Sequence, residues 1–451
     1  MLLIPAEARS WDGAAKAITR VWIADSLRGR FARGAVWSLL GAVIAQGSNL
    51  AASVITARLL GRETFGAYGM IQSTVGMLGI FAGLGLGVTA TKYVAEFRNR
   101  DPERAGGIIA LGSAVAILSG GLLALALLAY APVLAAKTLN APALADELRI
   151  GSAVLFFNAL NGAQIGALAG FEAFRSIARI NLARGLVAFP VTVAAVLLWR
   201  LPGAIWALAI TAAVTCVMSQ LSLRSHCVAL GIHMRFLSGW AERRVLWTFS
   251  TPAFLSAALV GPAIWIANTM LVKQPGGYAE MGVFSAANQW RTAIAFVPGV
   301  LAQFALPLLS NLNGERHVSR YNKVFRWNLI LTAAAATAVA VPVALGASQI
   351  MRLYGRGFQQ GWLVLVLSAA IAAIACVNGV VGTAILSAGS VWAGLGFNMM
   401  WAAVLLAGCY RFIPTNLSVG LAGSMLAAYV AHTVWQAAYL RHRLSSRNGI
   451  S

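Results

Sequence analysis

Long apolar stretches recur along almost the whole chain, separated by short polar breaks. Each is about as long as the roughly 20 residues that a helix needs to cross a bilayer. Backbone groups in lipid can satisfy their hydrogen bonds only within a helix or a closed barrel, so stretches of this length predict spanning helices. The predicted spans, about twelve, cover residues 35–57, 66–90, 107–130, 149–170, 182–199, 203–223, 250–272, 281–310, 325–347, 361–387, 392–410 and 417–440.

Composition supports this interpretation. Hydrophobic residues make up 59% of the 451 residues, and charged residues only 10%, where soluble domains have roughly 25%. The mean hydropathy is +0.76. We therefore predict an all-α integral membrane protein without a soluble domain. The net charge of +21 does not indicate nucleic-acid binding, because the basic residues lie in short loops and form no recognisable nucleic-acid module.

The distribution of these basic residues predicts the topology. When loops are assigned alternately to the two sides, fourteen lysine and arginine residues fall on one side and eight on the other. Positive residues collect on the cytoplasmic side of membrane proteins. The richer side also carries both ends of the chain, so both termini are expected in the cytoplasm, as an even number of helices requires.

The polar breaks divide the chain into five regions. Residues 1–34 form an N-terminal segment, in which 11–31 have the pattern of an amphipathic helix at an anionic leaflet; a partly disordered basic tail is the alternative. Residues 35–223 and 250–440 each contain six predicted spans. The basic stretch 224–249 connects these two lobes on the cytoplasmic side, and residues 441–451 form a cytoplasmic tail.

The two lobes contain a weak internal repeat. Residues 65–68 align with 281–284 at an offset of 216, which places Gln72 opposite Asn288, and Asn161-Gly162 aligns with Asn378-Gly379 at an offset of 217. A duplicated unit of six helices enters the membrane in the same direction twice. This predicts a pseudo-two-fold axis along the membrane normal, an arrangement found in transporters.

The charge found inside the predicted spans is positive only. All thirteen aspartate and glutamate residues lie outside the apolar stretches, whereas one arginine, Arg291, lies inside one. A charge in mid-helix costs roughly 2.5–3.5 kcal/mol on insertion, so it usually faces a cavity or a partner. A guanidinium forms paired hydrogen bonds with phosphate oxygens, so Arg291 predicts a site for an anion. The alternative is a structural role, in which it snorkels or binds a backbone carbonyl.

Polar side chains gather in helices one, two, seven and eight, the equivalent helices of the two lobes. Amides at a central cavity could bind sugar hydroxyls, whereas the alternative for each is a hydrogen bond between helices. Glycines between residues 76 and 87 indicate close packing or bending of the second helix rather than a phosphate-binding loop. The candidate amides are Gln46, Asn49, Gln72, Asn268, Asn288 and Gln289.

Enzyme and metal chemistry find no support in the sequence. The four cysteines form no CxxC pair, so neither a disulfide framework nor a metal site is expected. No Ser-His-Asp set, ATP motif or cofactor motif is apparent. We therefore expect a protein that is not an enzyme and that needs no metal or cofactor.

Four motifs resemble one family. Residues 57–68, ARLLGRETFGAY, are similar to the signature that closes the first helix of Wzx-like polysaccharide flippases, in the MOP superfamily. Residues 87–96 resemble the end of their second helix, residues 252–265 their seventh, and 285–291 their eighth. The resemblance covers most of residues 35–440 and leaves out the N-terminal segment.

The resemblance implies a MATE-like, two-lobed exporter in the bacterial inner membrane. Such a protein would move a polyprenyl-pyrophosphate-linked oligosaccharide from the cytoplasmic to the periplasmic leaflet by alternating access. Arg58 and Arg62 would then lie near the periplasmic rim and could draw the anionic head group outward. Partners would include the bilayer, a polysaccharide polymerase and a chain-length regulator. A lipid II flippase and a cation-coupled drug antiporter of the MATE type remain alternatives, although the antiporter normally requires a carboxylate in its N-terminal lobe.

Overall fold

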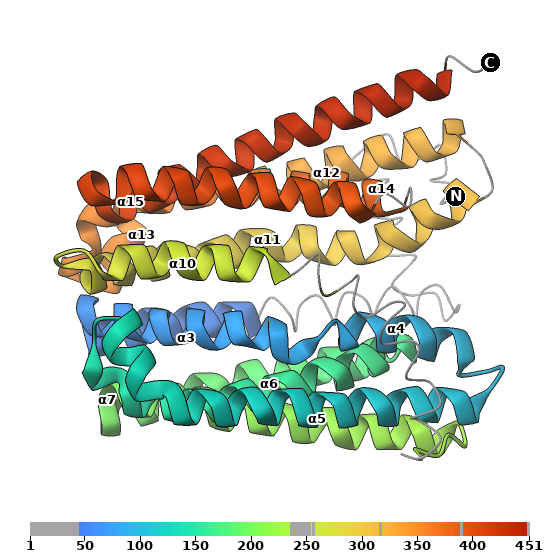
Figure 1. Ribbon diagram of the computed structural model, residues 1–451, viewed down its shortest axis with the longest axis horizontal. Helices are drawn as coiled ribbons and strands as arrows, with labels where there is room; N and C mark the ends of the chain where they lie inside the picture. The colour runs from blue at the N-terminus through green and yellow to red at the C-terminus, as the bar shows by residue number, and fades with distance from the viewer. Residues whose placement is uncertain (1–44, 235–253, 255–257, 315–317, 388–390, 449–451) are drawn as a thin grey trace, which may run out of the picture.

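The computed structural model describes residues 45–234, 254, 258–314, 318–387 and 391–448, and all regular structure within these ranges is helical. Figure 1 shows two layers of helices. The N-terminal bundle comprises the helical residues 45–60, α3 (Arg62–Gly83), α4 (Leu86–Phe97), α5 (Pro102–Val133), α6 (Ala145–Gly170) and α7 (Phe174–Ala229). The C-terminal bundle comprises α10 (Val260–Val272), α11 (Gly277–Gly314), α12 (Val318–Leu345), α13 (Ala347–Tyr354), α14 (Trp362–Ser387) and α15 (Val391–Asn448).

Seven of the described helices are long and apolar enough to cross a membrane. Their ends extend past several predicted spans; α15, for example, continues to Asn448 instead of ending near residue 440. The predicted N-terminal segment 1–34 and residues 235–249 of the predicted connection lie outside the described residues. Twelve spans with cytoplasmic termini therefore stay a prediction.

Large apolar side chains cover the outer faces of the helices, whereas small residues lie where the helices pack against one another. On α5, Leu118, Leu122 and Leu125 are each 65–70% exposed, as expected of side chains that contact lipid. On the opposite side, a Cβ added to Gly120 would lie 2.9 Å from the Ala159 Cβ. Small residues at helix contacts are typical of membrane bundles, because association there depends on close packing.

The long helix α7 reverses its direction at Arg200. This residue has φ 52° and ψ −126°, far from helical values. A Cβ added to Gly203 would overlap the carbonyl oxygen of Ala195, whereas eight residues of continuous helix would separate these positions by about 12 Å. The element therefore consists of two antiparallel helices joined by a tight turn.

The C-terminal bundle repeats this turn at an offset of 217. Leu417 has φ 46° and ψ −122°, and Gly420 lies against the carbonyl oxygen of Phe412 as Gly203 does against Ala195. The repeat predicted from the sequence is thus confirmed at positions that its alignment did not use.

The paired asparagines of the repeat make equivalent contacts. The Ser219 hydroxyl donates to Asn161 Oδ1 at 2.8 Å, and the Thr433 hydroxyl donates to Asn378 Oδ1 at 2.8 Å. Each asparagine thus joins the fourth predicted span of its half to the last one. The asparagine side chain thus contributes to packing between equivalent helices in both halves of the chain.

The glycines between residues 76 and 87 have two different roles, a helix break and a close helix contact. Leu84 (φ 43°) and Gly85 (φ 70°) end α3 and start α4, so the predicted second span is broken rather than continuous. A Cβ on Gly166 would overlap the backbone of Gly87, which shows that α4 packs on α6 through backbone contact. Bending and close packing are both confirmed.

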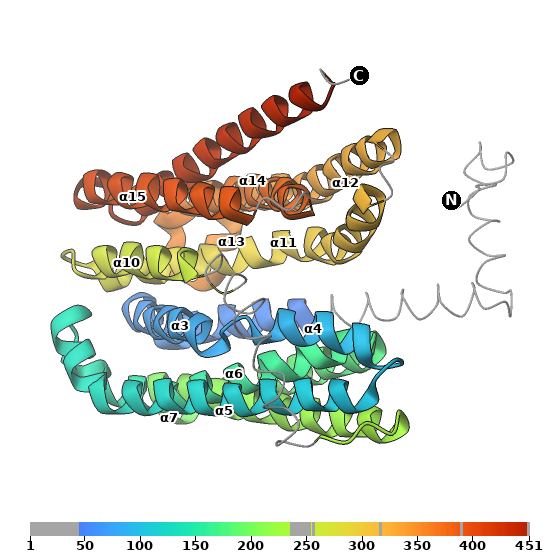
Figure 2. The same cartoon turned by 45° about the vertical axis from the view of Figure 1, so that its right-hand side comes forward.

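The two bundles meet where α3 crosses α11. A Cβ on Gly66 would overlap the Tyr278 carbonyl oxygen, and one on Gly282 would overlap the Arg62 carbonyl oxygen. These two pairs are related by the same offset of 216, so the contact is symmetric about the expected pseudo-two-fold axis. At the opposite end of the molecule, α12 and α4 lie well apart (Figure 2).

Candidate functional site

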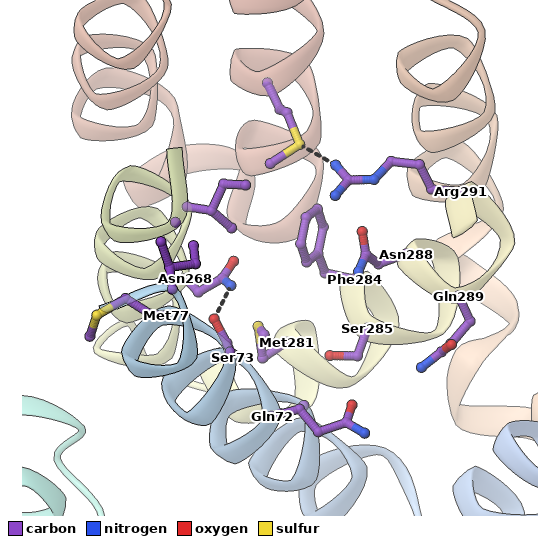
Figure 3. Close-up of a pocket in the computed structure, with 16 residues that line it drawn as sticks. Gln72, Ser73, Met77, Asn268, Met281, Phe284, Ser285, Asn288, Gln289 and Arg291 are labelled. Carbon is purple, nitrogen blue, oxygen red and sulfur yellow. Dashed lines mark hydrogen bonds between the residues drawn. The ribbon is translucent and has the colours of Figure 1, made fainter. Parts of the chain in front are cut away.

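A cavity of about 270 Å³ lies between the bundles, between α3 on one side and α10, α11 and α15 on the other. Figure 3 shows its polar and apolar side chains facing one another. The residues that line it are Gly69, Gln72, Ser73, Gly76, Met77, Ile80, Gly261, Ile264, Asn268, Met281, Phe284, Ser285, Asn288, Gln289, Arg291 and Met425. We call it the inter-bundle cavity.

Arg291 lies on α11, fourteen residues after the helix begins at Gly277, which corresponds to about 21 Å along the helix axis. Its side chain is half-buried, and Nη1 donates to the Met425 sulfur at 2.9 Å (Figure 3). A thioether is a weak acceptor, so this contact orients the guanidinium without neutralising it. Among the described residues no carboxylate pairs with Arg291.

The predicted amides of this cavity fall into two groups. Asn268 is buried, and its Nδ2 donates to Ser73 Oγ of α3 at 2.9 Å, so it makes the hydrogen bond between helices that was its alternative role. The side chains of Gln72, Asn288 and Gln289 bond no described residue. Figure 3 shows that Gln72 and Gln289 point away from Arg291.

Those two glutamines also line a second cavity, of about 340 Å³. It is lined by the N-terminal bundle and by one side of α11, and we call it the N-bundle cavity. Gln46 and Asn49 lie here rather than beside Arg291, so the structure distributes the predicted residues over two adjoining spaces. The lining residues are Gln46, Asn49, Ala52, Ser53, Thr56, Tyr68, Gln72, Val154, Asn158, Asn161, Arg184, Ala188, Thr192, Leu208, Thr211, Ala212, Thr215, Gln289 and Thr292.

Arg184 of the N-bundle cavity corrects the expectation that a single arginine lies within a span. It sits ten residues after the start of α7, roughly 15 Å along its axis. Its side chain is exposed to the cavity and bonds no described residue. Arg184 lies within the predicted span 182–199, yet only Arg291 was identified as an arginine inside a span. Its position inside an apolar run was the signal that could have identified it.

Arg58 and Arg62 line neither cavity. They lie where the two bundles meet. Arg62 of α3 donates from Nε to the Ala279 carbonyl of α11 at 3.0 Å, and its Nη2 pairs with Glu280. The Ser418 hydroxyl donates to the other oxygen of Glu280, and Arg58 Nε donates to the Leu353 carbonyl. Both arginines thus join the two bundles, and a contact with substrate stays a prediction for them.

The side chains that line the two cavities are of types that can bind oxyanions and hydroxyl groups. Each has one arginine among its described lining residues, together with amides, and neither lining includes a carboxylate. A guanidinium offers a planar fork of donors that matches phosphate or carboxylate oxygens, and amides both donate and accept hydrogen bonds. In the described part of the chain, no three His, Cys, Asp or Glu side chains come together as a metal site would require.

Comparison with known proteins identifies the family of the chain. Residues 31–313 match the family described as polysaccharide biosynthesis protein. The EPS I polysaccharide export inner membrane protein EpsE of Ralstonia nicotianae is 24% identical over 425 residues, which cover 91% of this chain and 94% of that protein. EpsE of Ralstonia solanacearum is 24% identical over 420 residues, covering 90% and 92%.

Solved structures show similarity of fold. The inward-facing conformation of a multidrug resistance MATE family transporter of the MOP superfamily has a TM-score of 0.71 at 16% identity, covering 90% of this chain and 95% of the transporter. A MOP superfamily transporter from Pyrococcus furiosus has a TM-score of 0.65 at 14% identity, covering 95% and 98%. The chain therefore has a MATE-like fold.

Proposed function

The chain belongs to the polysaccharide biosynthesis protein family, within the MOP superfamily, and we propose that it moves a polyprenyl-pyrophosphate-linked oligosaccharide from the cytoplasmic to the periplasmic leaflet. It is a membrane transporter of polysaccharide export, and the export proteins that it resembles are inner membrane proteins. We place it in the bacterial inner membrane, with a role of transport rather than catalysis. The polysaccharide polymerase and the chain-length regulator would act on its product.

One observation carries the proposal: two adjoining cavities each hold an arginine without a carboxylate. An unpaired anion cannot cross hydrocarbon without a large desolvation penalty. The polyprenyl tail is apolar and can remain in the bilayer, whereas the pyrophosphate and the glycan need a polar path. Arg291 would bind the pyrophosphate, and the amides would bind sugar hydroxyls. A cation-exchanging antiporter would need the opposite charge in these positions.

Alternating access would follow from the seam between the bundles. In the proposed orientation, the Arg62 and Glu280 end faces the periplasm and is closed, while the bundles diverge toward the cytoplasm (Figure 2). This corresponds to a cytoplasm-facing state that can receive substrate. Opening the seam and closing the opposite end would release the head group outside.

The test is a gene deletion complemented with variants. Loss of the protein should remove surface polysaccharide and cause polyprenyl-linked repeat units to accumulate on the cytoplasmic side. Arg291→Ala should fail to complement, and Arg291→Lys should complement in part, because the charge remains while the paired hydrogen bonds are lost. The exposed Arg326→Ala on α12 is the matched control, and all three variants should reach normal levels in the membrane.

The same strains separate the alternatives. Accumulation of lipid II instead of repeat units would assign the protein to peptidoglycan precursors. Increased sensitivity to cationic drugs with normal surface polysaccharide would support the antiporter. Full activity of Arg291→Ala would contradict the role proposed for this arginine.

A further inference from the structure

Three buried polar groups meet where the two bundles contact one another. The Tyr354 hydroxyl, at the end of α13, lies next to the Trp290 indole nitrogen of α11 and the Ser53 hydroxyl of helix 45–60. Tyr354 is 0% exposed and Ser53 is 9% exposed. None of these three polar atoms has a hydrogen-bond partner among the described residues. Two groups come from the C-terminal bundle and one from the N-terminal bundle, so we call this place the polar junction.

The polar junction lies at the closed end of the molecule. The Tyr354 ring packs against Phe65 of α3, with ring centroids 6.5 Å apart, and Phe65 precedes the glycine at which α3 crosses α11. Burying a hydroxyl or an indole N–H without a partner is unfavourable, because each loses its hydrogen bonds to water. Three such groups would therefore favour separation of the bundles, at the end where the structure shows them in contact.

The Ser53 hydroxyl does not use the acceptor nearest to it. Serines inside helices commonly donate to the backbone carbonyl four residues earlier, as Ser113 and Ser424 do at 2.8 and 2.7 Å. Ser53 makes no such bond, and its hydroxyl lies beside Tyr354 of the other bundle instead. The side chain is thus directed toward the polar junction rather than toward its own helix.

The hydrogen-bonding types of the three groups indicate what binds between them. The Trp290 indole N–H can only donate, whereas the hydroxyls of Ser53 and Tyr354 can donate and accept. An N–H donor does not suit a cation. A water molecule accepts two hydrogen bonds and donates two, so it can accept from the indole and bond both hydroxyls. Buried waters typically make about three hydrogen bonds, to polar groups that otherwise have no partner.

We propose that the polar junction binds a structural water that bridges the two bundles and stabilises the closed end. The water bonds Trp290 and Tyr354 on one side and Ser53 on the other, so its site is complete only while the bundles are in contact. Opening this end would release the water and hydrate each group separately. The site does not depend on which molecule is carried, whereas its release rests on the alternating access proposed above.

The experiment measures the ratio of open to closed molecules in the full-length protein in nanodiscs. Spin labels at Asn140 and Lys273, which are exposed on opposite bundles, report the distance across this end after removal of the four natural cysteines. The variant is Tyr354→Phe, which removes only the hydroxyl. It is measured alone and together with Glu280→Gln, because Glu280 pairs with Arg62 across the same contact and weakening this pair makes changes in either direction measurable.

The direction of the change decides between a bridged and an empty junction. With a bound water, Tyr354→Phe removes one hydrogen bond from the closed state and should raise the ratio of open to closed molecules by about two- to twelve-fold. Without it, phenylalanine removes a buried group that had no partner, and the ratio should fall. Ser53→Ala should act in the same direction as Tyr354→Phe, and the double variant should add less than both single effects, because both act through one water.

Two variants serve as matched controls. Tyr410→Phe makes the same change at a tyrosine of α15 that is 78% exposed. Ser113→Ala removes a serine hydroxyl that bonds the Ile109 carbonyl of its own helix. Neither should alter the ratio. Replacing chloride by gluconate in the buffer should also leave it unchanged; opening in the absence of chloride would identify an anion at the junction and overturn the water.

A density map of the closed state that resolves waters should show a peak within hydrogen-bonding distance of Tyr354 Oη, Trp290 Nε1 and Ser53 Oγ. Direct contact among these atoms without a peak would overturn the inference, and so would a lower ratio in Tyr354→Phe. If the peak is present but no variant separates the labels, the water site stands and the proposed alternating access fails. If Glu280→Gln separates the labels and the peak is missing, only the water site fails.

Discussion

Replacing Glu280 by glutamine should open the closed end of the molecule. Glu280 accepts hydrogen bonds from Arg62 of the other bundle and from Ser418 of its own. Glutamine has nearly the same size but no charge. The ion pair between the bundles would become a neutral contact, whereas packing around Gly66 and Gly282 would stay the same.

The size of the effect follows from the burial of the pair. The side chains of Arg62 and Glu280 are 27% and 19% exposed, so neither is fully hydrated in the closed state. Hydrogen bonds to charged groups contribute roughly 1.5–3 kcal/mol, and fully exposed ion pairs less than about 1 kcal/mol. Glu280→Gln should therefore shift the ratio of closed to open seam by roughly 10- to 150-fold.

The shift can be measured as a distance between spin labels. Asn140 and Lys273 are exposed on opposite bundles at this end, where Tyr278 donates to the Leu139 carbonyl at 2.9 Å. Labels at these two positions, on a background without the four natural cysteines, should report a larger long-distance population in Glu280→Gln. Arg62→Gln with Glu280→Gln should add little to the larger single effect, because both changes remove one interaction.

Asp146→Asn is the matched control. Asp146 pairs with Arg149 at 2.7 Å on the surface of α6, and the side chains are 81% and 47% exposed. This change should leave the distances unaltered. Unchanged distances in Glu280→Gln, or equal changes in both variants, would refute the claim that the buried pair holds the seam closed.

Three further predictions concern topology, rocking and packing. Reporter fusions after Ser446 should report cytoplasm and fusions within residues 273–280 periplasm; a periplasmic C-terminus would overturn the proposed orientation. A disulfide between Arg62→Cys and Glu280→Cys should stop transport until it is reduced, and undiminished transport with the disulfide in place would exclude rocking of the bundles. Gly166→Ala should lower the melting temperature, because its Cβ would overlap the backbone of Gly87, whereas Gly162→Ala on the same helix has open space and should not; overpacking of this kind costs about 1–3 kcal/mol.

The sequence predicted the repeat because duplicated packing needs duplicated residues. Asn161 and Asn378 hold equivalent helices together, and an amide in an apolar span is easy to recognise. The turns at Arg200 and Leu417 share the offset but not the residue type, since the constraint there is on the backbone. Only the glycine three residues later, Gly203 and Gly420, is shared at this offset, and one matched glycine in a glycine-rich chain is a weak signal.

The candidate site was predicted only in part, for two physical reasons. The start of α7 at Phe174 was not visible, because basic residues in a first helical turn resemble a loop, so the span was predicted to begin at residue 182 and Arg184 was not identified as a site residue. Amides on neighbouring helices were assigned to one cavity, whereas the direction in which each side chain points separates Gln46 and Asn49 from Arg291. Such directions depend on helix rotation, which hydropathy does not determine.

The glycine crossing of α3 and α11 also bears on the insulation of the membrane. Water-filled cavities that open to the cytoplasm would short-circuit the proton gradient unless the far end were sealed. At Gly66 and Gly282 two backbones touch with no side chain between them, and Phe65 packs edge-on against Phe358 with ring centroids 6.0 Å apart, so this crossing leaves no room for water between α3 and α11. A Cβ at Gly66 would push the helices apart, and its first effect on the cell would be a proton leak.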